Sequence, residues 1–364
     1  MASQIRTVAP QEELQRSSEK RSTPRIPTML IAVPAAILLL LGSVIVATLA
    51  GAVHISPRSV AAVLLHLSTS STQSEKIILL HVRLPRVLTA GVIGAGLSIA
   101  GVLFQGLFRN PMADPYVLGT SGGAALGAAF GIFVFPHSSI LGFSATASLA
   151  FAGSLLTIAC VYGLARVGGG TPTVPLLLAG LAITAVLSEA SSVLIYLGNE
   201  ISWNARNLAL WLQGSVAVVN WGQLLLAAGM LAIGALLCIP LRPILNALAL
   251  GEDYAQQLGI PLEFARAAII IVASLLTSSA VLLGGVIGFV GLLVPHVVRL
   301  LLGPEHGRLL FFSAICGASY LIIADTFSRI VIAPSELPVG VVTAFLGGPL
   351  LLYLLRRSKK EYAL

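Results

Sequence analysis

Few side chains in this chain are suited to acid–base or metal chemistry, and they are scattered. Glu189 lies inside an apolar stretch, 174–197, close to three serines. An ionisable residue in such a stretch normally lines an ion or substrate path or bonds to a neighbouring helix, and both interpretations of Glu189 stay open. Asp325 and Arg329 are four residues apart, a spacing that brings opposite charges together on a helix. We expect them to form a structural ion pair.

The usual motifs for catalysis and nucleotide binding are missing. The sequence contains no G-x-x-x-x-G-K-[ST] loop, no H-E-x-x-H and no G-x-S-x-G, so we expect ATP to be bound, if at all, by a partner chain. His296 is alone in its apolar stretch, and one imidazole without a partner is a poor metal ligand, so we interpret it as structural. We therefore predict no catalytic residue, no metal site and no cofactor on this chain, and no enzyme activity of its own.

One polar segment, 248–260, has the features of a short capped helix. Gly251 interrupts the apolar stretch before it, and Glu252 and Asp253 follow at the positive end of the expected helix dipole. Gly259 is in the position of a C-terminal cap. A simple connecting turn does not require a capped helix, so we favour a docking element for a partner protein.

The composition requires a membrane to surround these elements. Of the 364 residues, 57% are hydrophobic and only 10% charged, with a mean hydropathy of +0.96. A soluble domain is usually about 25% charged, which excludes an ordinary cytosolic enzyme, a disordered chain and a nucleic-acid binder. About 20 apolar residues span a bilayer as a helix. We predict ten spans, of which the eighth and ninth are short, at 28–51, 86–107, 116–135, 140–165, 174–197, 221–241, 264–283, 286–302, 308–325 and 337–355.

Ten spans place both termini on one side of the membrane. The predicted domains are an N-terminal tail (1–27), a membrane domain (28–357) and a C-terminal tail (358–364). With both tails in the cytoplasm, 15 of the 21 lysines and arginines lie inside, which agrees with the positive-inside rule. The remaining six lie outside, at Arg58, Lys76, Arg83, Arg86, Arg206 and Arg329.

Six collinear motifs in residues 30–357 resemble those of the FecCD-type permeases, the membrane subunits of ABC importers for iron-siderophores, haem and vitamin B12. The coupling-helix pattern G-E-x-x-A-x-x-L-G is matched by Gly251, Glu252, Ala255, Leu258 and Gly259. The other matches are RLPR at 83–86, QGLFRNPMADPYVLGTSGGA at 105–124, LLLAG at 176–180, GVIGFVGLLVPHVVRL at 285–300 and ELPVGVVTAFLGGP at 336–349.

The resemblance implies an all-α polytopic membrane protein, the ten-helix bundle of the vitamin B12 permease, or type II ABC importer, class. It also implies a multi-pass location in the bacterial inner membrane and a second permease subunit, most simply a homodimer. Two ABC ATPase subunits would dock on the cytoplasmic side, and a periplasmic or lipid-anchored substrate-binding protein on the other side.

The resemblance assigns roles to individual residues. The ATPase-coupling element comprises Leu250, Gly251, Glu252, Asp253, Ala255, Leu258 and Gly259. Arg83, Arg86 and Arg329 match basic positions that meet glutamates of the binding protein, and we expect them to be exposed, as steering and bidentate contacts require. The cytoplasmic gate matches Thr173 and Val174, although the family's hydroxyl pattern is only half kept there, and Glu189 is a candidate pathway residue.

We therefore predict an ABC importer permease that moves an iron-siderophore, haem or cobalamin inward, powered by separate ATPase subunits. The principal alternative is an ion- or proton-coupled secondary transporter, which would depend on a membrane gradient and on Glu189. A structural membrane scaffold without transport is a third possibility. Both alternatives leave the capped polar segment without a function.

Overall fold

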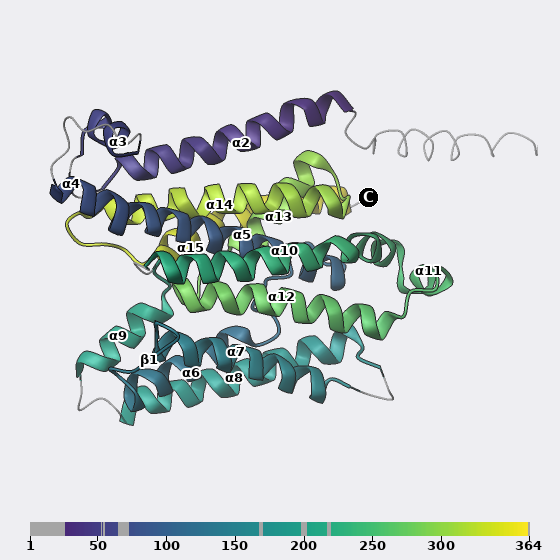
Figure 1. The fold of residues 1–364 in the computed structure, drawn as a ribbon. Coiled ribbons are helices and arrows are strands. Elements are labelled where there is room, and N and C mark those ends of the chain that lie inside the picture. Colours follow the sequence, from purple (N-terminus) through teal and green to yellow (C-terminus); the bar gives the residue numbers. More distant parts are fainter. Residues whose placement is uncertain are drawn as a thin grey trace, which may run out of the picture.

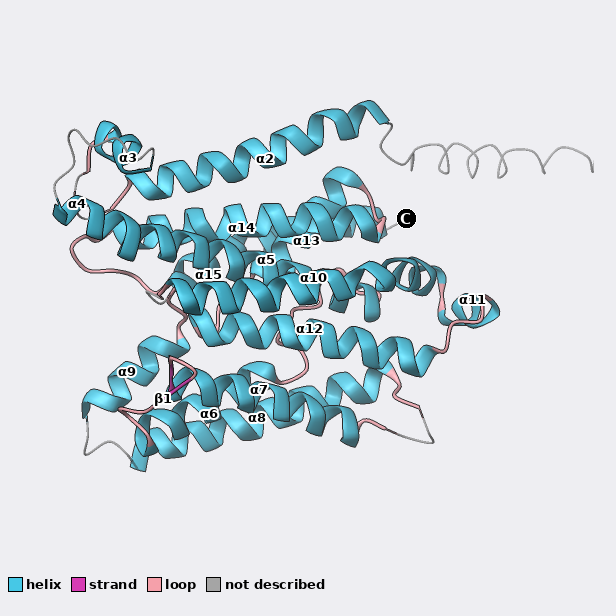
Figure 2. Cartoon of the chain, in the orientation of Figure 1, coloured by secondary structure: helices cyan, strands magenta, loops and turns pink. Residues whose placement is uncertain are grey.

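The computed structural model describes residues 26–51, 53, 55–64, 73–166, 170–197, 202–216 and 220–362. This part of the chain is almost wholly helical (Figure 2). The predicted N-terminal tail up to residue 25 lies outside the described residues. The last helix continues to Tyr362, within the predicted C-terminal tail, and the division into a membrane domain and two tails stays a prediction.

In the part of the chain that the structure describes, ten long or apolar helices form the bundle, and Figure 1 shows their arrangement. They are α2 (Ile26–Leu49), α5 (Leu84–Leu107), α6 (Thr120–Val134), α7 (Ala145–Leu164), α8 (Thr173–Leu197), α10 (Trp221–Leu250), α12 (Leu262–Gly284), α13 (Val290–Leu302), α14 (His306–Ile330) and α15 (Val339–Tyr362). Shorter elements lie at the ends of the bundle: α3 (Pro57–Leu64), α4 (Gln73–Ile77), the π-helix η1 (Ile78–Arg83), α9 (Ser202–Leu212), α11 (Glu252–Gln257) and the two-stranded hairpin β1 (Ser139–Ile140) and β2 (Phe143–Ser144).

Each of the ten predicted spans coincides with one of these helices. Seven are long and apolar enough to cross a membrane, and α6, α13 and the described apolar part of α15 are shorter. The prediction of a short span at 308–325 is wrong, because α14 has 25 residues. Its polar end residues lower the hydropathy, but they are paired inside the protein, so the helix continues past them.

Helix α5 is the centre of the bundle and packs against α14, α12, α13 and α10. Small residues allow these helices to approach closely. A Cβ added at Gly94 would lie 2.1 Å from the Gly317 carbonyl oxygen of α14, and one at Gly101 would lie 1.8 Å from the Gly291 carbonyl oxygen of α13. Packing of this kind replaces the hydrophobic driving force that lipid does not provide.

Two non-helical connections meet within the bundle. The segment before α6 contains Pro115, which lies against Gly291 at the start of α13. Tyr116 then accepts a hydrogen bond on its hydroxyl oxygen from the Ile287 backbone N–H, at 3.2 Å. Gly119 has a φ of 90°, in the left-handed region that a right-handed helix does not contain, which explains why α6 begins at Thr120 and not at the predicted residue 116. Irregular backbone is tolerated here because protein covers it.

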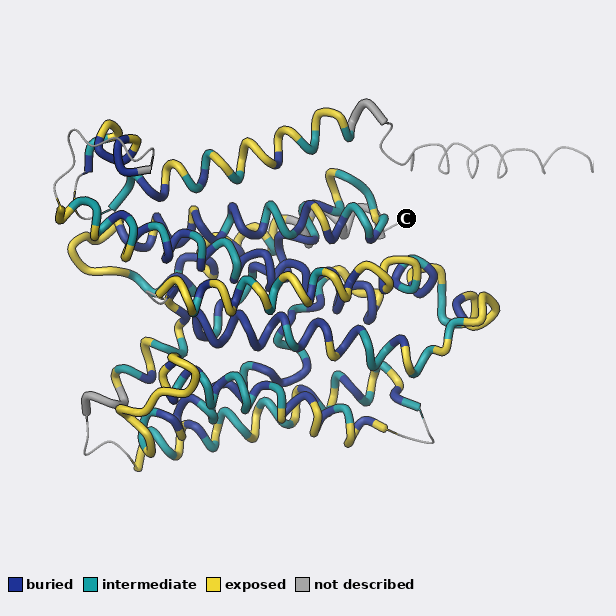
Figure 3. Tube along the Cα trace, viewed as in Figure 1, coloured by how far each residue is buried: buried dark blue, intermediate teal, exposed yellow. Residues whose placement is uncertain are grey.

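Burial divides the helices into a core and a periphery (Figure 3). In the most apolar 18-residue stretch of each helix, 89% of the residues are buried in α5, 72% in α12 and 67% in α14. In the corresponding stretches of α2 and α8, only 11% of the residues are buried. These two helices are therefore free to face lipid or another chain along most of their length.

Candidate functional site

The short helix α11 protrudes from one end of the bundle, which we call the α11 end (Figure 1). It begins with Glu252 and Asp253 in its first turn. Gly251 before it has a φ of 126° and Gly259 after it has a φ of 77°, in the region that favours glycine. The predicted capped helix is therefore confirmed, while its role in docking stays a prediction.

Helix α11 has one anchored face and one free face. Ala255 is fully buried and belongs to the main hydrophobic core. Tyr254, Leu250 and Leu258 are exposed. The α11 end thus presents large apolar side chains on α11 and directly before and after it, while the helix is fixed underneath, which is a surface suited to a protein partner.

Charged side chains tie α11 to the neighbouring helices. The guanidinium of Arg266, in the second turn of α12, lies 2.7 Å from the Glu252 carboxylate and 2.7 Å from that of Glu263. Arg109, just after α5, reaches Glu252 at 4.0 Å. The Arg266 side chain is 11% exposed, and the carboxylates of Glu252 and Glu263 are 34% and 42% exposed. Water therefore reaches both acids, whereas Arg266 is held between them.

This arrangement continues to the start of α8. The second carboxylate oxygen of Glu263 accepts hydrogen bonds from the Thr171 backbone N–H at 3.0 Å and from its hydroxyl at 2.7 Å. Thr171 is 1% exposed and lies two residues before α8 begins. We call Glu252, Arg266, Glu263 and Thr171 the α11 network. Thr171 and Glu263 were not predicted from the sequence, where the available signal is a second threonine, Thr171, two residues before the predicted gate residue Thr173.

The predicted gate residues lie beside this network. Thr173 is the first residue of α8 and is half-buried, and Val174 is 65% exposed. Both are within three residues of Thr171. Their part in gating remains a prediction.

Glu189 lies two-thirds of the way along α8, on an exposed face. The nearby hydroxyls are satisfied by their own helix: Ser191 donates to the Leu187 carbonyl at 2.8 Å, and Ser192 donates to the Ser188 carbonyl at 3.0 Å. Within the described residues no ion pair holds the Glu189 carboxylate. A charge on the outer wall of a membrane bundle is costly unless water or protein covers it.

The opposite end of the bundle, where α3 and α4 lie, carries a second charged group. Asp325 of α14 is fully buried, 3.0 Å from the guanidinium of Arg86 and 3.0 Å from Nε of Arg329. Glu336 also contacts Arg86, at 2.9 Å, and its side chain is 47% exposed. We call these four residues the α3-end cluster. The predicted pairing of Asp325 with Arg329 is confirmed.

The expectation that Arg83, Arg86 and Arg329 are exposed is wrong. They are 5%, 8% and 7% exposed. Arg83 donates to the carbonyl oxygens of Thr48 and Leu49, in the last turn of α2, and of Val53 beyond it. The buried Asp325 attracts the other two arginines inward. All three guanidiniums thus have partners within the chain.

A third charged group caps α14 at the α11 end. Glu305 accepts backbone hydrogen bonds from Gly307 at 2.7 Å and Arg308 at 2.9 Å, and one from the side chain of Asn246 at 3.3 Å. Partial burial opposes ionisation of Glu305, but these bonds and the nearby charge of Arg308 outweigh it and lower the pKa. The side chain is 40% exposed, and among the described residues its hydrogen bonds and ion pair do not involve α8.

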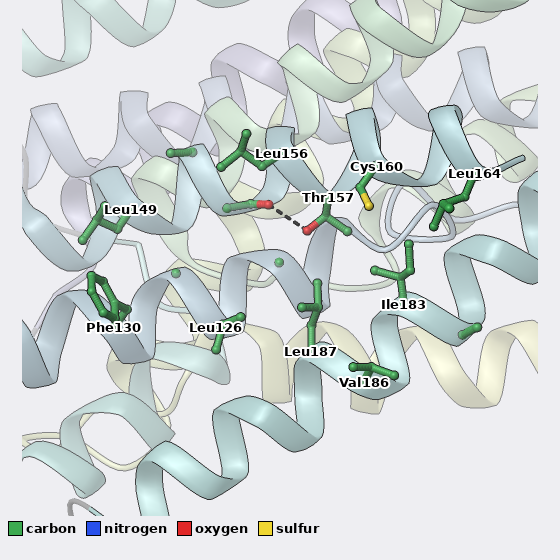
Figure 4. A pocket seen from close by; sticks show the side chains of 15 residues that line it. Leu126, Phe130, Leu149, Leu156, Thr157, Cys160, Leu164, Ile183, Val186 and Leu187 are labelled. Atoms are coloured by element: carbon green, nitrogen blue, oxygen red, sulfur yellow. Dashed lines mark hydrogen bonds between the residues drawn. The ribbon is translucent and has the colours of Figure 1, made fainter. Parts of the chain in front are cut away.

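A cavity with a volume of about 710 Å³ opens on the outer wall between α6, α7 and α8. Its lining is almost entirely apolar, with Leu156, Leu164 and Val186 among the exposed members (Figure 4). The one hydroxyl labelled there, that of Thr157, already donates to the Gly153 carbonyl at 2.8 Å. The cavity therefore offers mainly hydrocarbon contacts, beside the free Cys160 thiol.

Among the residues that the structure describes, no three histidine, cysteine or acidic side chains lie close enough to hold a metal ion. His296 is half-buried on α13. It contacts no carboxylate in the described part of the chain, and its structural role stays a prediction.

Comparison with known proteins places these features in a family. The model of the FecCD transport family matches residues 38–357. The chain is 40% identical over 296 residues to the hemin transport system permease protein HmuU of Yersinia pestis, covering 81% of this chain and 87% of that protein. It is 39% identical over 285 residues to the cobalamin import system permease protein BtuC of Halobacterium salinarum, covering 78% and 74%.

A solved structure has the same architecture. An inward-facing ABC transporter assigned to the metal-chelate type matches with a TM-score of 0.76 and 29% sequence identity. The match covers 89% of this chain and 98% of that chain. The likeness therefore extends over most of the bundle.

Proposed function

The chain belongs to the FecCD transport family, and from that premise we propose its substrate class, its partners and its orientation. It is the membrane-spanning permease subunit of an ABC importer. We propose that it carries an iron-siderophore complex inward, with haem and cobalamin as the other members of the class. The names of its relatives support this class, because they are permeases for hemin, cobalamin and metal chelates.

The observation that carries the proposal is α11. An ABC ATPase would bind the exposed apolar side chains Tyr254, Leu250 and Leu258, while the buried Ala255 holds the helix to the bundle. ATP is bound and hydrolysed by that partner, and this chain contributes no catalytic residue. The α11 end is then cytoplasmic, as are both termini, and the protein spans the bacterial inner membrane.

A second permease copy would cover α8. This helix is among the least buried of the bundle and carries Glu189 on its exposed face. Lipid is an unfavourable environment for a carboxylate, whereas a water-filled path between two copies is a suitable one. We therefore place the substrate path along α8, with Thr173 and Val174 at its cytoplasmic mouth.

The binding protein would dock at the α3 end, which is periplasmic in this orientation. Because Arg86 is held by the half-exposed Glu336, an acidic side chain of the binding protein would displace Glu336 and take its place. Arg83 and Arg329 would add positive potential from below the surface. Glu336→Gln should then tighten binding-protein capture, about two- to fivefold at low salt. Weaker capture by this variant would contradict the exchange.

The test of function is uptake by proteoliposomes that contain this chain and its ATPase. ATP is supplied on the α11 side, and binding protein with a ferric siderophore, haem or cobalamin on the other side. ATP-dependent accumulation of one of them is expected and identifies the substrate. Accumulation that needs no ATP and collapses with the proton gradient would instead establish a secondary transporter.

A further inference from the structure

The α11 network connects α12 to the start of α8, two helices that otherwise meet mainly through their shared neighbours α7 and α6. Helix α11 follows α10 and leads into α12, whereas α8 packs chiefly against α6 and α7. Glu263 in the first turn of α12 and Thr171 before α8 are 92 residues apart in sequence. Their two hydrogen bonds, at 3.0 and 2.7 Å, are thus a direct link from the α11 side to the start of α8.

The link has the geometry needed to transmit a displacement. One carboxylate oxygen of Glu263 binds Arg266 and the other binds Thr171, so both neighbours are held by one rigid group. Arg266 is in turn 2.7 Å from Glu252, the first residue of α11. Hydrogen bonds between charged groups are short and directional, so a shift of α11 changes the position of Glu263 or breaks a contact.

The end of the link is as well fixed as its middle. Thr171 is 1% exposed, and its backbone N–H as well as its side chain is engaged. A pull on Thr171 therefore moves the main chain, and Pro172 and the first turn of α8 follow it directly. A side-chain contact alone would allow the hydroxyl to rotate without moving the helix.

We propose that Glu263 is a positioning residue that transmits the movement of α11 to the first turn of α8, through Arg266 on one side and Thr171 on the other. The inference rests on the proposed function, because α11 moves only if an ATPase docks on it. It adds to that function the route by which ATP binding reaches the substrate path. Coupling routes of this kind require evidence from the coupling itself and not from proximity.

The experiment uses the complete transporter in proteoliposomes and measures ATP hydrolysis and uptake together. Glu263→Gln and Thr171→Val should leave hydrolysis within about twofold of wild type and lower uptake per ATP by about threefold to thirtyfold. Thr171→Ser retains the hydroxyl and should behave as wild type. Glu305→Gln is the matched control, since its carboxylate has nearly the same exposure at the same end and binds backbone N–H groups that do not lead to α8.

A fluorophore on Leu178→Cys, in a chain whose exposed Cys160 is replaced by serine, reports on α8 directly. ATP should change its emission in the otherwise wild-type chain and in Glu305→Gln, and not in Glu263→Gln. Two results overturn the proposal. One is wild-type uptake per ATP in both Glu263→Gln and Thr171→Val, and the other is an ATP-dependent emission change that persists in Glu263→Gln. Loss of hydrolysis together with uptake also overturns it, because it indicates a structural role. If the wild-type chain itself shows no ATP-dependent uptake, the proposed function fails, which is a different result.

Discussion

The two ends of the bundle use the same chemical groups under different conditions. In the α3-end cluster Asp325 is fully buried between Arg86 and Arg329. In the α11 network one buried guanidinium lies between two carboxylates that are 34% and 42% exposed. The first arrangement holds two arginines around one buried carboxylate, and the second holds two solvent-exposed carboxylates around one arginine.

The difference determines what each end can do. Removing one partner of a buried pair leaves a charge without water or counter-ion, which is strongly destabilising. Exposed pairs contribute little to stability, because water replaces the lost partner. The α3-end cluster is therefore suited to holding α5 and α14 in one arrangement. The α11 network is suited to breaking and re-forming as α11 moves.

The largest effect is expected for Asp325→Asn. It leaves the guanidiniums of Arg86 and Arg329 buried without their main counter-ion, at a cost of about 3–5 kcal/mol. Thermal unfolding in detergent measures this, with reaction of the buried Cys238 thiol as the signal. Glu336→Gln is the control, and we expect it to cost about 1 kcal/mol or less because water reaches that side chain. Equal midpoints for the two variants would remove the distinction between the two ends.

The triple variant Asp325→Leu, Arg86→Met and Arg329→Met sharpens the same comparison. Apolar residues of similar volume often replace a buried ionic group without loss of stability. We expect its unfolding midpoint to lie well above that of Asp325→Asn. A midpoint as low as that of the single variant would mean that packing, and not the unpaired charge, is responsible.

A smaller loss of stability is expected at the other end. Arg266→Met removes the guanidinium from Glu252 and Glu263, but water can solvate both carboxylates, so we expect about 1–2 kcal/mol. Uptake per ATP should fall much more than stability does. A loss of stability as large as that of Asp325→Asn, with coupling intact, would reverse the roles that we assign to the two ends.

Added salt should also affect the two ends differently, and this effect is smaller than those of the substitutions. The Debye length falls from about 10 Å at 0.1 M salt to about 3 Å at 1 M, and buried pairs are screened least. Amide hydrogen exchange at Thr171, whose N–H is bonded to Glu263, should therefore accelerate a few-fold in 1 M salt. Amides of α14 around Asp325 should not respond. Equal changes in amide exchange rate at both ends would show that the α11 network is as well shielded from solvent as the α3-end cluster.

The sequence was sufficient to predict each helix of the bundle, the capped α11 and the pair Asp325–Arg329, because these depend on local apolar length, capping residues and a four-residue spacing. The burial of Arg86 and the bonds between Glu263 and Thr171 were not predictable in this way. Both are contacts between residues far apart in the chain, and each depends on how helices are placed side by side. Tertiary packing decides whether a charged residue near a helix end points to water or to a buried carboxylate.

The smallest effect is expected for Glu189→Gln. This variant tests whether Glu189 has a role like that of either charged group, the α3-end cluster or the α11 network. Glu189 lies exposed on α8 with no ion pair among the described residues, so unlike Asp325 it holds no buried partner, and unlike Glu263 it links no second helix. A carboxylate that only borders a hydrated path can be replaced by its amide with little change in polarity or shape. We expect ATP-driven uptake within about twofold of wild type, because a change in the coupling free energy of about 0.5 kcal/mol or less alters uptake by little more than a factor of two. Loss of uptake in this variant, accompanied by dependence on the proton gradient, would mean that the carboxylate carries protons and that the α11 network does not supply the driving force.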